Sequence, residues 1–329
     1  MVCLTTPEQE NQLSATLDHQ ARLGPPTVEE VSPDVFAYIQ PDGSWWINNT
    51  GFLVGSPRVV AIDTCATEAR SRAFQAAIHN ITDRPVQTLT NTHHHGDHTH
   101  GNYLFDTATI VAHERCREEI LAEGPPATAP VAASGAWDGP EWGHIEIAPL
   151  FLTYTDTVKV YVDDLRCEVS YIGTPAHSTN DSIIWIPERS VLFAGDLLFN
   201  GGTPFLLAGS IAGALKAVAS LKQFKAETIV PGHGPTTGPA VIDDVLGYLQ
   251  FVSDLARNSK AAGLTPLQAA QEADLGRFAE LSDTERTVGN LHRAYAELDG
   301  AEPGAKINIR SAIEDMVTYN GGKPLTCLA

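Results

Sequence analysis

Basic residues are scarce in this chain, which has 21 Lys and Arg against 40 Asp and Glu and a formal net charge of -19. Such a surface repels phosphate backbones, so the composition argues against nucleic acid as a partner. Long apolar runs are also missing, and we expect no membrane span. The first ten residues lack both the basic and the apolar region of a secretory signal, so the sequence predicts a cytoplasmic protein.

The cysteines show no pattern that indicates disulfide bonds. The five cysteines are widely spaced and never form a CxxC pair; they are Cys3, Cys65, Cys116, Cys167 and Cys327. An odd, dispersed set of this kind indicates free thiols in a reducing compartment rather than a disulfide framework.

The distribution of strand-like and helical segments predicts three regions. Residues 1–26 are polar with weak helical periodicity and are interpreted as an N-terminal arm, for which a second copy of the chain (a homodimer) is a candidate partner. Residues 27–240 contain two strand-rich halves, each with helices, which favours two sheets packed face to face with helices outside. Residues 241–329 are helical and are interpreted as a cap on the same domain.

Individual elements follow from local patterns of apolar residues and turn residues. Strands are expected at 27–31, 35–39, 51–54, 59–62, 86–91, 110–112, 158–162, 168–172, 182–186, 191–194 and 228–230. Helices are expected at 68–80, 114–122, 209–224, 241–256 and 311–319, with further helices beginning at Thr265-Pro266 and at Ser282 or Asp283. Thr265, Pro266 and Gln268 match the N-cap, N1 and N3 positions of a capping box.

Residues 123–149 break any regular pattern with Gly and Pro and carry two tryptophans, Trp137 and Trp142. A long irregular insertion of this kind is often a lid or binding loop. The alternative is a surface loop that its aromatic side chains attach to the body of the protein.

The stretch Thr92-His93-His94-His95-Gly96-Asp97-His98 places His93, His95, Asp97 and His98 within six positions, directly after a buried strand. This donor set suits one or two divalent metals, zinc above all. Three further candidates, His177, Asp196 and His233, each follow a strand-like run and have Gly or Pro nearby. We expect all of them to meet at strand ends.

The series His93-x-His95-x-Asp97-His98, then His177, Asp196 and His233, resembles the metallo-β-lactamase superfamily in its broad hydrolase branch. The resemblance implies an αββα sandwich, an α/β (α+β) fold, with a dinuclear site at one edge. It also implies that His93, His95 and His177 bind one metal and that Asp97, His98 and His233 bind the second, with Asp196 bridging. Two Zn²⁺ ions per chain are expected, with Mn or Fe as alternatives. The segments 40–49, 98–102 and 202–205 also look similar to actinobacterial members, which include cyclase-thioesterases of aromatic polyketide pathways.

Two metals about 3.5–4 Å apart can share a hydroxide that attacks a carbonyl carbon. Asp97 is the candidate catalytic residue that accepts a proton, although its pKa should be depressed if it binds metal. Within the superfamily, His95 stands where diiron oxidoreductases carry Glu, and Asp196 stands where one class of true β-lactamases carries Cys. The acidic charge disfavours the nucleic-acid-cleaving branch, and the tail lacks the basic patch of the glutathione thioester hydrolases. Hydrolysis of an uncharged or weakly charged ester, thioester or lactone is the expected activity.

Other residues are candidates for supporting roles. Asp63 is expected to hold a ligand imidazole, with a helix N-cap as its alternative; His100 is expected either in the cleft or capping a turn. A pocket for an apolar or aromatic small-molecule substrate is expected from Trp45, Trp46, Trp137, Trp142, Phe199 and Phe205. Two other functions use the same residues: a cyclase that couples carbon–carbon bond formation to release, and a metal-bound scaffold without catalysis.

Overall fold

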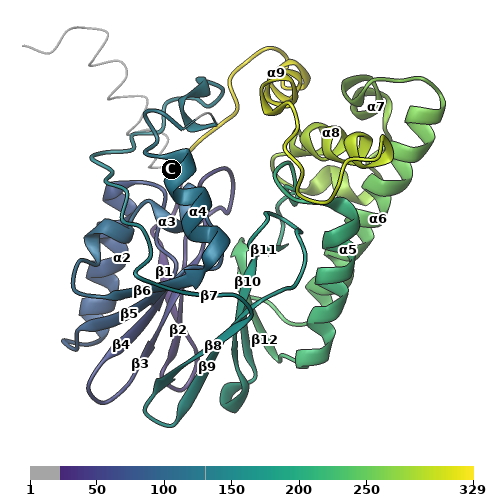
Figure 1. Ribbon diagram of the computed structural model, residues 1–329. Helices are drawn as coiled ribbons and strands as arrows, with labels where there is room; N and C mark the ends of the chain where they lie inside the picture. Colours follow the sequence, from purple (N-terminus) through teal and green to yellow (C-terminus); the bar gives the residue numbers. More distant parts are fainter. Residues whose placement is uncertain (1–22, 130) are drawn as a thin grey trace, which may run out of the picture.

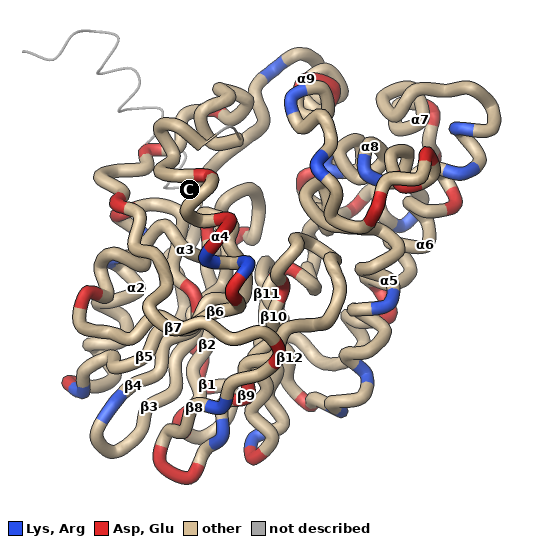
Figure 2. Tube along the Cα trace, in the orientation of Figure 1, with Lys and Arg blue, Asp and Glu red and all other residues tan. Residues whose placement is uncertain are grey.

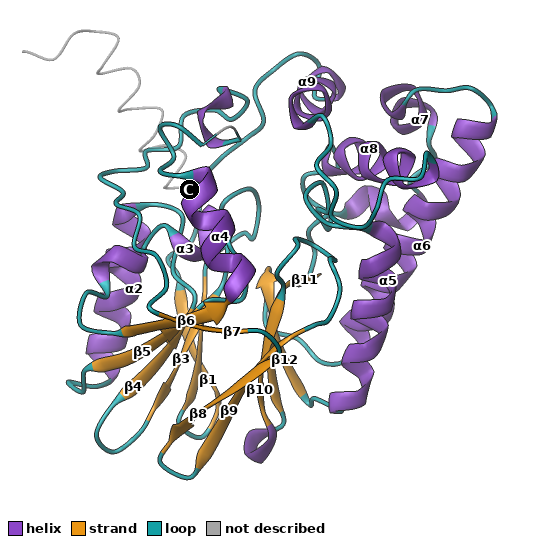
Figure 3. Cartoon of the chain, viewed as in Figure 1, coloured by secondary structure: helices purple, strands orange, loops and turns teal. Residues whose placement is uncertain are grey.

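The computed structural model describes residues 23–129 and 131–329, so most of the expected N-terminal arm lies outside the described residues. Two sheets form the centre of the molecule and helices cover both outer faces, as Figures 1 and 3 show. This confirms the expected αββα sandwich. Among the described residues no helix is both long enough and apolar enough to cross a bilayer.

The first sheet has seven strands in sequence order. They are β1 (Thr27–Ser32), β2 (Val35–Ile39), β3 (Thr50–Val54), β4 (Val59–Ile62), β5 (Val86–Thr90), β6 (Thr109–His113) and β7 (Leu152–Tyr154). β1 to β4 are antiparallel, and β4 to β7 are parallel. The ends of β4 and β5 therefore lie at the same edge of the sheet, which brings Asp63 next to the motif that follows β5.

The second sheet has the order β12-β11-β10-β9-β8. Its strands are β8 (Thr157–Val162), β9 (Leu165–Tyr171), β10 (Ser182–Ile186), β11 (Val191–Phe199) and β12 (Thr228–His233). β8 and β9 alternate between more and less exposed residues, as expected for strands with one face toward the core. β11 is buried throughout because it has neighbours on both faces.

Three apolar clusters hold these layers together. The cluster between the sheets includes Leu53 and Ile62 from the first sheet and Ile184 and Val230 from the second. On the outer face of the first sheet pack α2 (Glu68–Ile81) and α4 (Glu114–Glu123). On the outer face of the second pack α5 (Ile211–Ser220) and α6 (Ala240–Ala261). Charged side chains lie mainly on helices and on the loops at the strand ends (Figure 2).

The remaining helices form the cap beside the ends of the sheets. They are α7 (Pro266–Glu272), α8 (Arg286–Leu298) and α9 (Ile309–Tyr319). The capping box at the start of α7 forms as expected, since Thr265 and Gln268 satisfy each other's backbone N–H groups. α8 begins at Arg286, a few residues later than the start expected at Ser282 or Asp283.

Two expected boundaries were wrong and one strand was not expected, each for a physical reason. The helix expected at 209–224 ends at Ser220 and continues as a 3-10 turn, Leu221–Phe224. β7 was not expected, because it is only three residues long and pairs at the sheet edge. The strand expected at 191–194 runs to Phe199, since Gly195 adopts a φ of 51° and shifts the register without ending the strand. Asp196 therefore lies inside β11 rather than past its end.

Candidate metal centre

Two groups of imidazoles and carboxylates meet where the two sheets end. The first group is His93, His95 and His177, and the second is Asp97, His98, Asp196 and His233; within each group the candidate donor atoms lie within 4.8 Å of one another. The structure thus brings together all seven residues that the sequence singled out, although they come from four separate segments of the chain.

The first group converges on one point. Nε2 of His93 lies 3.1 Å from Nδ1 of His95, and Nε2 of His177 lies 2.7 Å from the same nitrogen. His93 and His95 follow β5, which ends at Thr90. His177 lies in the loop between β9 and β10. Three imidazole nitrogens facing a common centre form a typical ligand set for a divalent metal.

The second group surrounds the carboxylate of Asp196. Its Oδ1 lies 3.0 Å from Nε2 of His98, and its Oδ2 lies 3.3 Å from Nε2 of His233. Oδ2 is also 3.3 Å from Nε2 of His177 in the first group. Asp97 completes the group, with Oδ2 3.3 Å from Nε2 of His233. Asp196 is therefore the one residue of the seven whose carboxylate contacts both groups in these pairings.

In His98, His233 and His177, the ring nitrogen that faces away from the two groups contacts a hydrogen-bond acceptor. Nδ1 of His98 lies 2.9 Å from Oδ2 of Asp63, and Nδ1 of His233 lies 3.1 Å from the Gly43 carbonyl. Nδ1 of His177 meets the carbonyl of Phe205. These acceptors place the proton on Nδ1 and leave Nε2 as the metal-binding nitrogen.

Asp63 has the supporting role that was expected of it. Besides His98, its carboxylate accepts hydrogen bonds from the backbone N–H (2.7 Å) and the hydroxyl (2.8 Å) of Thr92. That hydroxyl lies 3.0 Å from Nδ1 of His93. The alternative role as a helix N-cap is wrong, because Thr67 caps α2. Asp63 thus orients one imidazole of each group.

His100 does not reach the two groups. Its Nδ1 lies 3.0 Å from the carbonyl of Ala66, and its ring stacks on Trp46 and meets the edge of Trp142. It links the stretch that carries His93 to His98 to the start of α2 instead. His94 points away from its neighbours, with Nδ1 3.0 Å from Asn180 and Nε2 3.5 Å from Glu123.

Burial and mutual charge shift the pKa values of the seven side chains in opposite directions. Burial, with the neighbouring imidazoles, holds the pKa of His93 and of His95 well below the usual range. Burial also lowers the pKa of His233, but Asp196 and Asp97 outweigh it and raise the value to about 9. Although burial works against ionisation, His233 and His98 hold the pKa of Asp196 well below normal. His93 and His95 are therefore neutral in the first group, whereas His233 and Asp196 in the second group carry opposite charges.

The donor set fits a pair of divalent metal ions. Nε2 of His98 and Oδ1 of Asp196 are both buried without an aligned hydrogen-bond partner, although they are only 3.0 Å apart. Buried polar atoms are normally satisfied, and two such atoms that face a common point suit a cation between them. Imidazole nitrogens together with carboxylate oxygens match the ligand preferences of zinc and its neighbours in the periodic table.

A cleft that is open to solvent leads from the two groups to the surface. Its floor contains His95, Asp97, His177, Asp196 and His233. Its walls are mainly apolar, and they consist of Trp45, Trp46, Val131, Trp137, Phe199, Phe205, Leu207, Ile309 and Ile313. Of the expected pocket residues only Trp142 is not in the wall; it packs behind Trp46, with ring centroids 4.9 Å apart.

Two charged wall residues were missed by the sequence analysis. Arg286, at the start of α8, is buried and lies over the rings of Trp45 and Phe199, 4.2 and 5.4 Å from the centroids. Glu123 ends α4 at the opposite side of the cleft. No local pattern marked either residue, because both reach the cleft only through the packing of distant helices.

Comparison with known proteins agrees with this geometry. The family model described as "Metallo-beta-lactamase superfamily" matches residues 43–233. Among curated proteins, the chain is 28% identical to 2,4-dinitroanisole O-demethylase subunit alpha of Nocardioides sp. (strain JS1661), over 46% of this chain and 41% of that protein. It is 24% identical to a linear primary-alkylsulfatase of Pseudomonas sp. (strain ATCC 19151), over 66% and 48%. The chain thus spans less than half the length of these two relatives.

Solved structures share the fold. A metallo-beta-lactamase from Pontibacter korlensis superposes with a TM-score of 0.54 at 20% identity, covering 69% of this chain and 99% of that one. A stereoselective inverting sec-alkylsulfatase from Pseudomonas sp. superposes with a TM-score of 0.67 at 17% identity, covering 88% and 52%. At 20% and 17% identity, these superpositions establish architecture and not substrate.

Proposed function

The chain belongs to the metallo-beta-lactamase superfamily, and from that premise we propose that it is a dinuclear metal-dependent hydrolase of esters, thioesters or lactones with an apolar or aromatic body. Two Zn²⁺ ions are the proposed cofactor. The observation that carries the proposal is the cleft: its floor contains five of the seven potential metal ligands, and tryptophan, phenylalanine and isoleucine side chains form much of its walls.

Each of the two groups of residues would bind one metal ion. His93, His95 and His177 would hold one ion, and Asp97, His98 and His233 would hold the other, with Asp196 shared. When bound, such a pair supplies a hydroxide nucleophile at neutral pH and polarises the scissile carbonyl. The chain needs no serine or cysteine nucleophile in this scheme, and the four described cysteines are all buried.

The protein side chains supply orientation and a dry environment. Asp63 keeps the proton on Nδ1 of His98, which fixes the direction of that ring. Trp45 and Phe205 pack edge to face, 4.9 Å between centroids, and place a rigid apolar wall beside the floor. An aromatic or long acyl group that lies against this wall would leave its carbonyl over the ligands.

Asp97 is proposed as a ligand rather than as a general base. Burial raises its pKa, but the positive charges of His98 and His233 outweigh burial and hold it below the usual range. A carboxyl group with a lowered pKa is a poor proton acceptor near neutral pH. The sequence analysis expected Asp97 to accept a proton and its pKa to be depressed if it binds metal; the lowered pKa favours the ligand role.

The activities for which the relatives are named bear on the choice of the bond that is cleaved. One relative acts on an aryl methyl ether by its name, one on linear primary alkyl sulfates, and a third, 30% identical over 44% of this chain and 46% of its own length, is a hydroxyacylglutathione hydrolase of Rhodospirillum rubrum. Thioester cleavage is the activity nearest to our proposal. An alkyl sulfate and an aryl ether therefore belong in any substrate panel as competing candidates.

The test is metal content by elemental analysis of gently purified protein, together with hydrolysis of aryl esters, aryl thioesters, lactones, an alkyl sulfate and an aryl methyl ether. We expect about two zinc ions per chain and turnover of a carbonyl substrate that is lost on chelation and in Asp97→Ala. Asp83→Ala, which changes a fully exposed side chain, is the matched control. Turnover of the sulfate or the ether alone would refute the carbonyl specificity, and two metals without any turnover would refute the hydrolase.

A further inference from the structure

The segment after α9 contributes to the cleft from outside the region that carries the metal ligands. Leu325 forms a parallel β-bridge with Trp137 of the 123–149 insertion. Its N–H donates to the carbonyl of Ala136 (2.7 Å), and its carbonyl accepts from the N–H of Asp138 (2.9 Å). One residue of the tail therefore holds the insertion backbone on both sides of Trp137.

Trp137 depends on this support because its own side chain has no polar anchor. It is buried and lines the cleft, yet its indole N–H has no hydrogen-bond partner among the described residues. It contacts the edges of Trp45 and Trp46, with ring centroids 5.2 and 5.6 Å apart. The position of the ring is thus set by packing and by the backbone that Leu325 holds.

The same tail is fixed to a second wall of the cleft. The guanidinium of Arg70 on α2 donates to the carbonyl of Leu328 (2.7 Å) and to the side chain of Gln40 (2.8 Å). The thiol of Cys327 lies 3.8 Å from the carbonyl of Trp45. The tail therefore links the insertion to the loop that carries Trp45 and Trp46.

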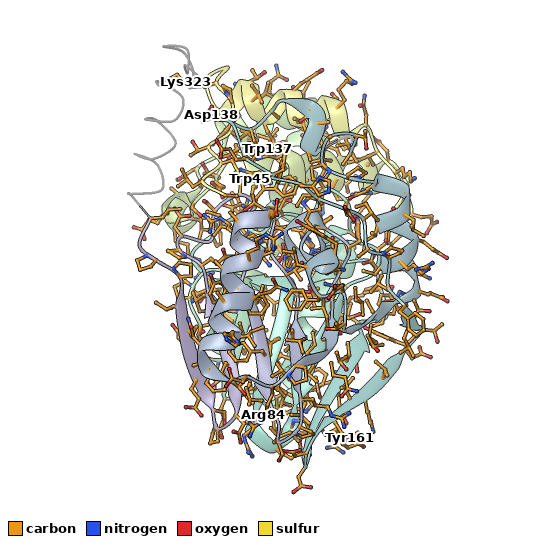
Figure 4. All side chains as sticks on the ribbon, turned by 90° about the vertical axis from the view of Figure 1, so that its left-hand side faces the viewer. Trp45, Arg84, Trp137, Asp138, Tyr161 and Lys323 are labelled. Carbon is orange, nitrogen blue, oxygen red and sulfur yellow. The ribbon has the colours of Figure 1, made fainter. Side chains whose placement is uncertain are left out.

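The views agree with these contacts. In Figure 1 the yellow segment after α9 crosses from the cap toward the half of the molecule that carries α2 and α4. In Figure 4, Lys323, Asp138, Trp137 and Trp45 lie at the same end of the molecule, far from Arg84 and Tyr161. The tail therefore runs from the cap to the half of the molecule that carries α2 and α4, at the end where Trp45 and Trp137 lie.

We propose that Leu325 is a positioning residue for substrate specificity: through Trp137 it sets the width of the apolar cleft and so the size of the group that the cleft accepts. Leu325 itself is completely buried and is not a wall residue of the cleft, so it acts through Trp137. Its side chain belongs to the same apolar cluster as Ala136 and Trp137, and truncation of that side chain would loosen the packing that keeps the backbone bridge in place. This inference rests on the proposed function for the nature of the substrate, but its effect on the cleft is independent of catalysis.

The test compares Leu325→Ala with Leu325→Met, which keeps side-chain volume, and with Lys323→Ala, whose side chain is exposed. For Leu325→Ala we expect a KM increase of roughly 10-fold for a small aryl ester, kcat within about twofold, and a smaller penalty or a gain for bulkier esters. Quenching of tryptophan fluorescence by acrylamide should increase, and metal content should not change. Leu325→Met should keep the parent values of KM, kcat, quenching and metal content, and so should Lys323→Ala.

An unchanged KM profile and unchanged quenching in Leu325→Ala, with only lower stability, would overturn the proposal and leave Leu325 a purely structural residue. If Leu325→Ala does not fold, Arg70→Gln tests the same link from the Leu328 side and should shift quenching and KM in the same direction. If the parent protein hydrolyses no ester but quenching still increases in Leu325→Ala, the proposed function fails while the positioning of Trp137 by Leu325 stands.

Discussion

The carboxylate of Asp63 lies 2.9 Å from Nδ1 of His98, and both side chains are buried. This contact joins the end of β4 to the motif after β5, and the parallel pairing of these two strands makes it possible. A carboxylate behind an imidazole fixes its tautomer and increases its basicity toward a metal. The affinity of the second group of ligands therefore depends on a residue outside the motif.

Asp63→Asn should weaken metal binding at the second group by roughly 10- to 100-fold, because the amide no longer requires the proton on Nδ1 of His98. Competition with a chromophoric chelator would measure the two affinities separately. The Asp106→Asn variant, at an exposed aspartate, provides the control. Equal loss from both sites in Asp63→Asn would show that the contact with Thr92 matters as much as the one with His98.

Asp97→Ala should reduce the metal content from about two ions per chain toward one, since the three imidazoles of the first group do not depend on Asp97. Asp196→Ala should affect both ions, because its carboxylate contacts members of both groups. Elemental analysis of the two variants side by side measures the difference. Identical stoichiometries in the two variants would contradict the bridging position of Asp196.

Metal uptake should release protons and strengthen as the pH rises toward about 9. In the metal-free protein the carboxylates raise the pKa of His233 to about 9 despite the opposing effect of burial, so this imidazole is protonated at neutral pH. A metal must displace that proton. The protonated form also stabilises the metal-free fold below about pH 6.5, and that contribution is lost as the pH rises through about 9. Titration with zinc in weakly buffered solution with a pH indicator would detect the release; a pH-independent affinity would contradict it.

The buried pair of Arg286 and Asp283, 2.9 Å apart, offers a test of how the cap is held to the site. Arg286→Met should destabilise the protein by about 3–5 kcal/mol, because it leaves Asp283 without its counter-ion. The double variant Arg286→Met/Asp283→Asn should recover most of that loss. Urea denaturation measures both.

The pH dependence of that loss has a defined sign. Burial already raises the pKa of Asp283 to about 6 even though Arg286 acts to lower it, and removal of Arg286 would raise it further. A carboxyl group whose pKa is raised by folding lowers the stability at any pH above its pKa in the unfolded state, which is near 4. The destabilisation should therefore be larger at pH 8 than at pH 5. A loss of equal size at both pH values would show that packing against Trp45, not charge, is the main contribution of Arg286.

Phe205→Ala should raise KM for aromatic esters with little change in metal content, since the ring packs on Trp45 and only its backbone carbonyl meets His177. A loss of about 2 kcal/mol of apolar contact corresponds to roughly a 30-fold change in KM. Phe151→Ala, at a side chain that is 85% exposed, is the control. Loss of metal in Phe205→Ala would show that the carbonyl moves with the side chain.

The sequence predicted most of the fold because the strands are short, apolar and separated by clear turn residues. β2, β4 and β10 match their expected limits. The seven clustered residues were also predicted, since each occurs in a short, distinctive stretch. Arg286, Glu123 and the carbonyl of Gly43 were not, because their roles depend on tertiary packing alone. Trp142 was placed in the pocket wall wrongly for the same reason: its packing against Trp46 outside the wall depends on how the insertion folds back on the loop of Trp46.

The match to the family model ends at His233, whereas Arg286, Ile309, Ile313 and the tail that holds Trp137 all lie beyond it. The proposed metal ligands and part of the cleft wall are therefore encoded in different stretches of the gene. Exchange of residues 241–329 for the corresponding stretch of a relative would alter selectivity while the ligand set stayed intact. Recombination at this one junction could give the same chemistry access to new compounds.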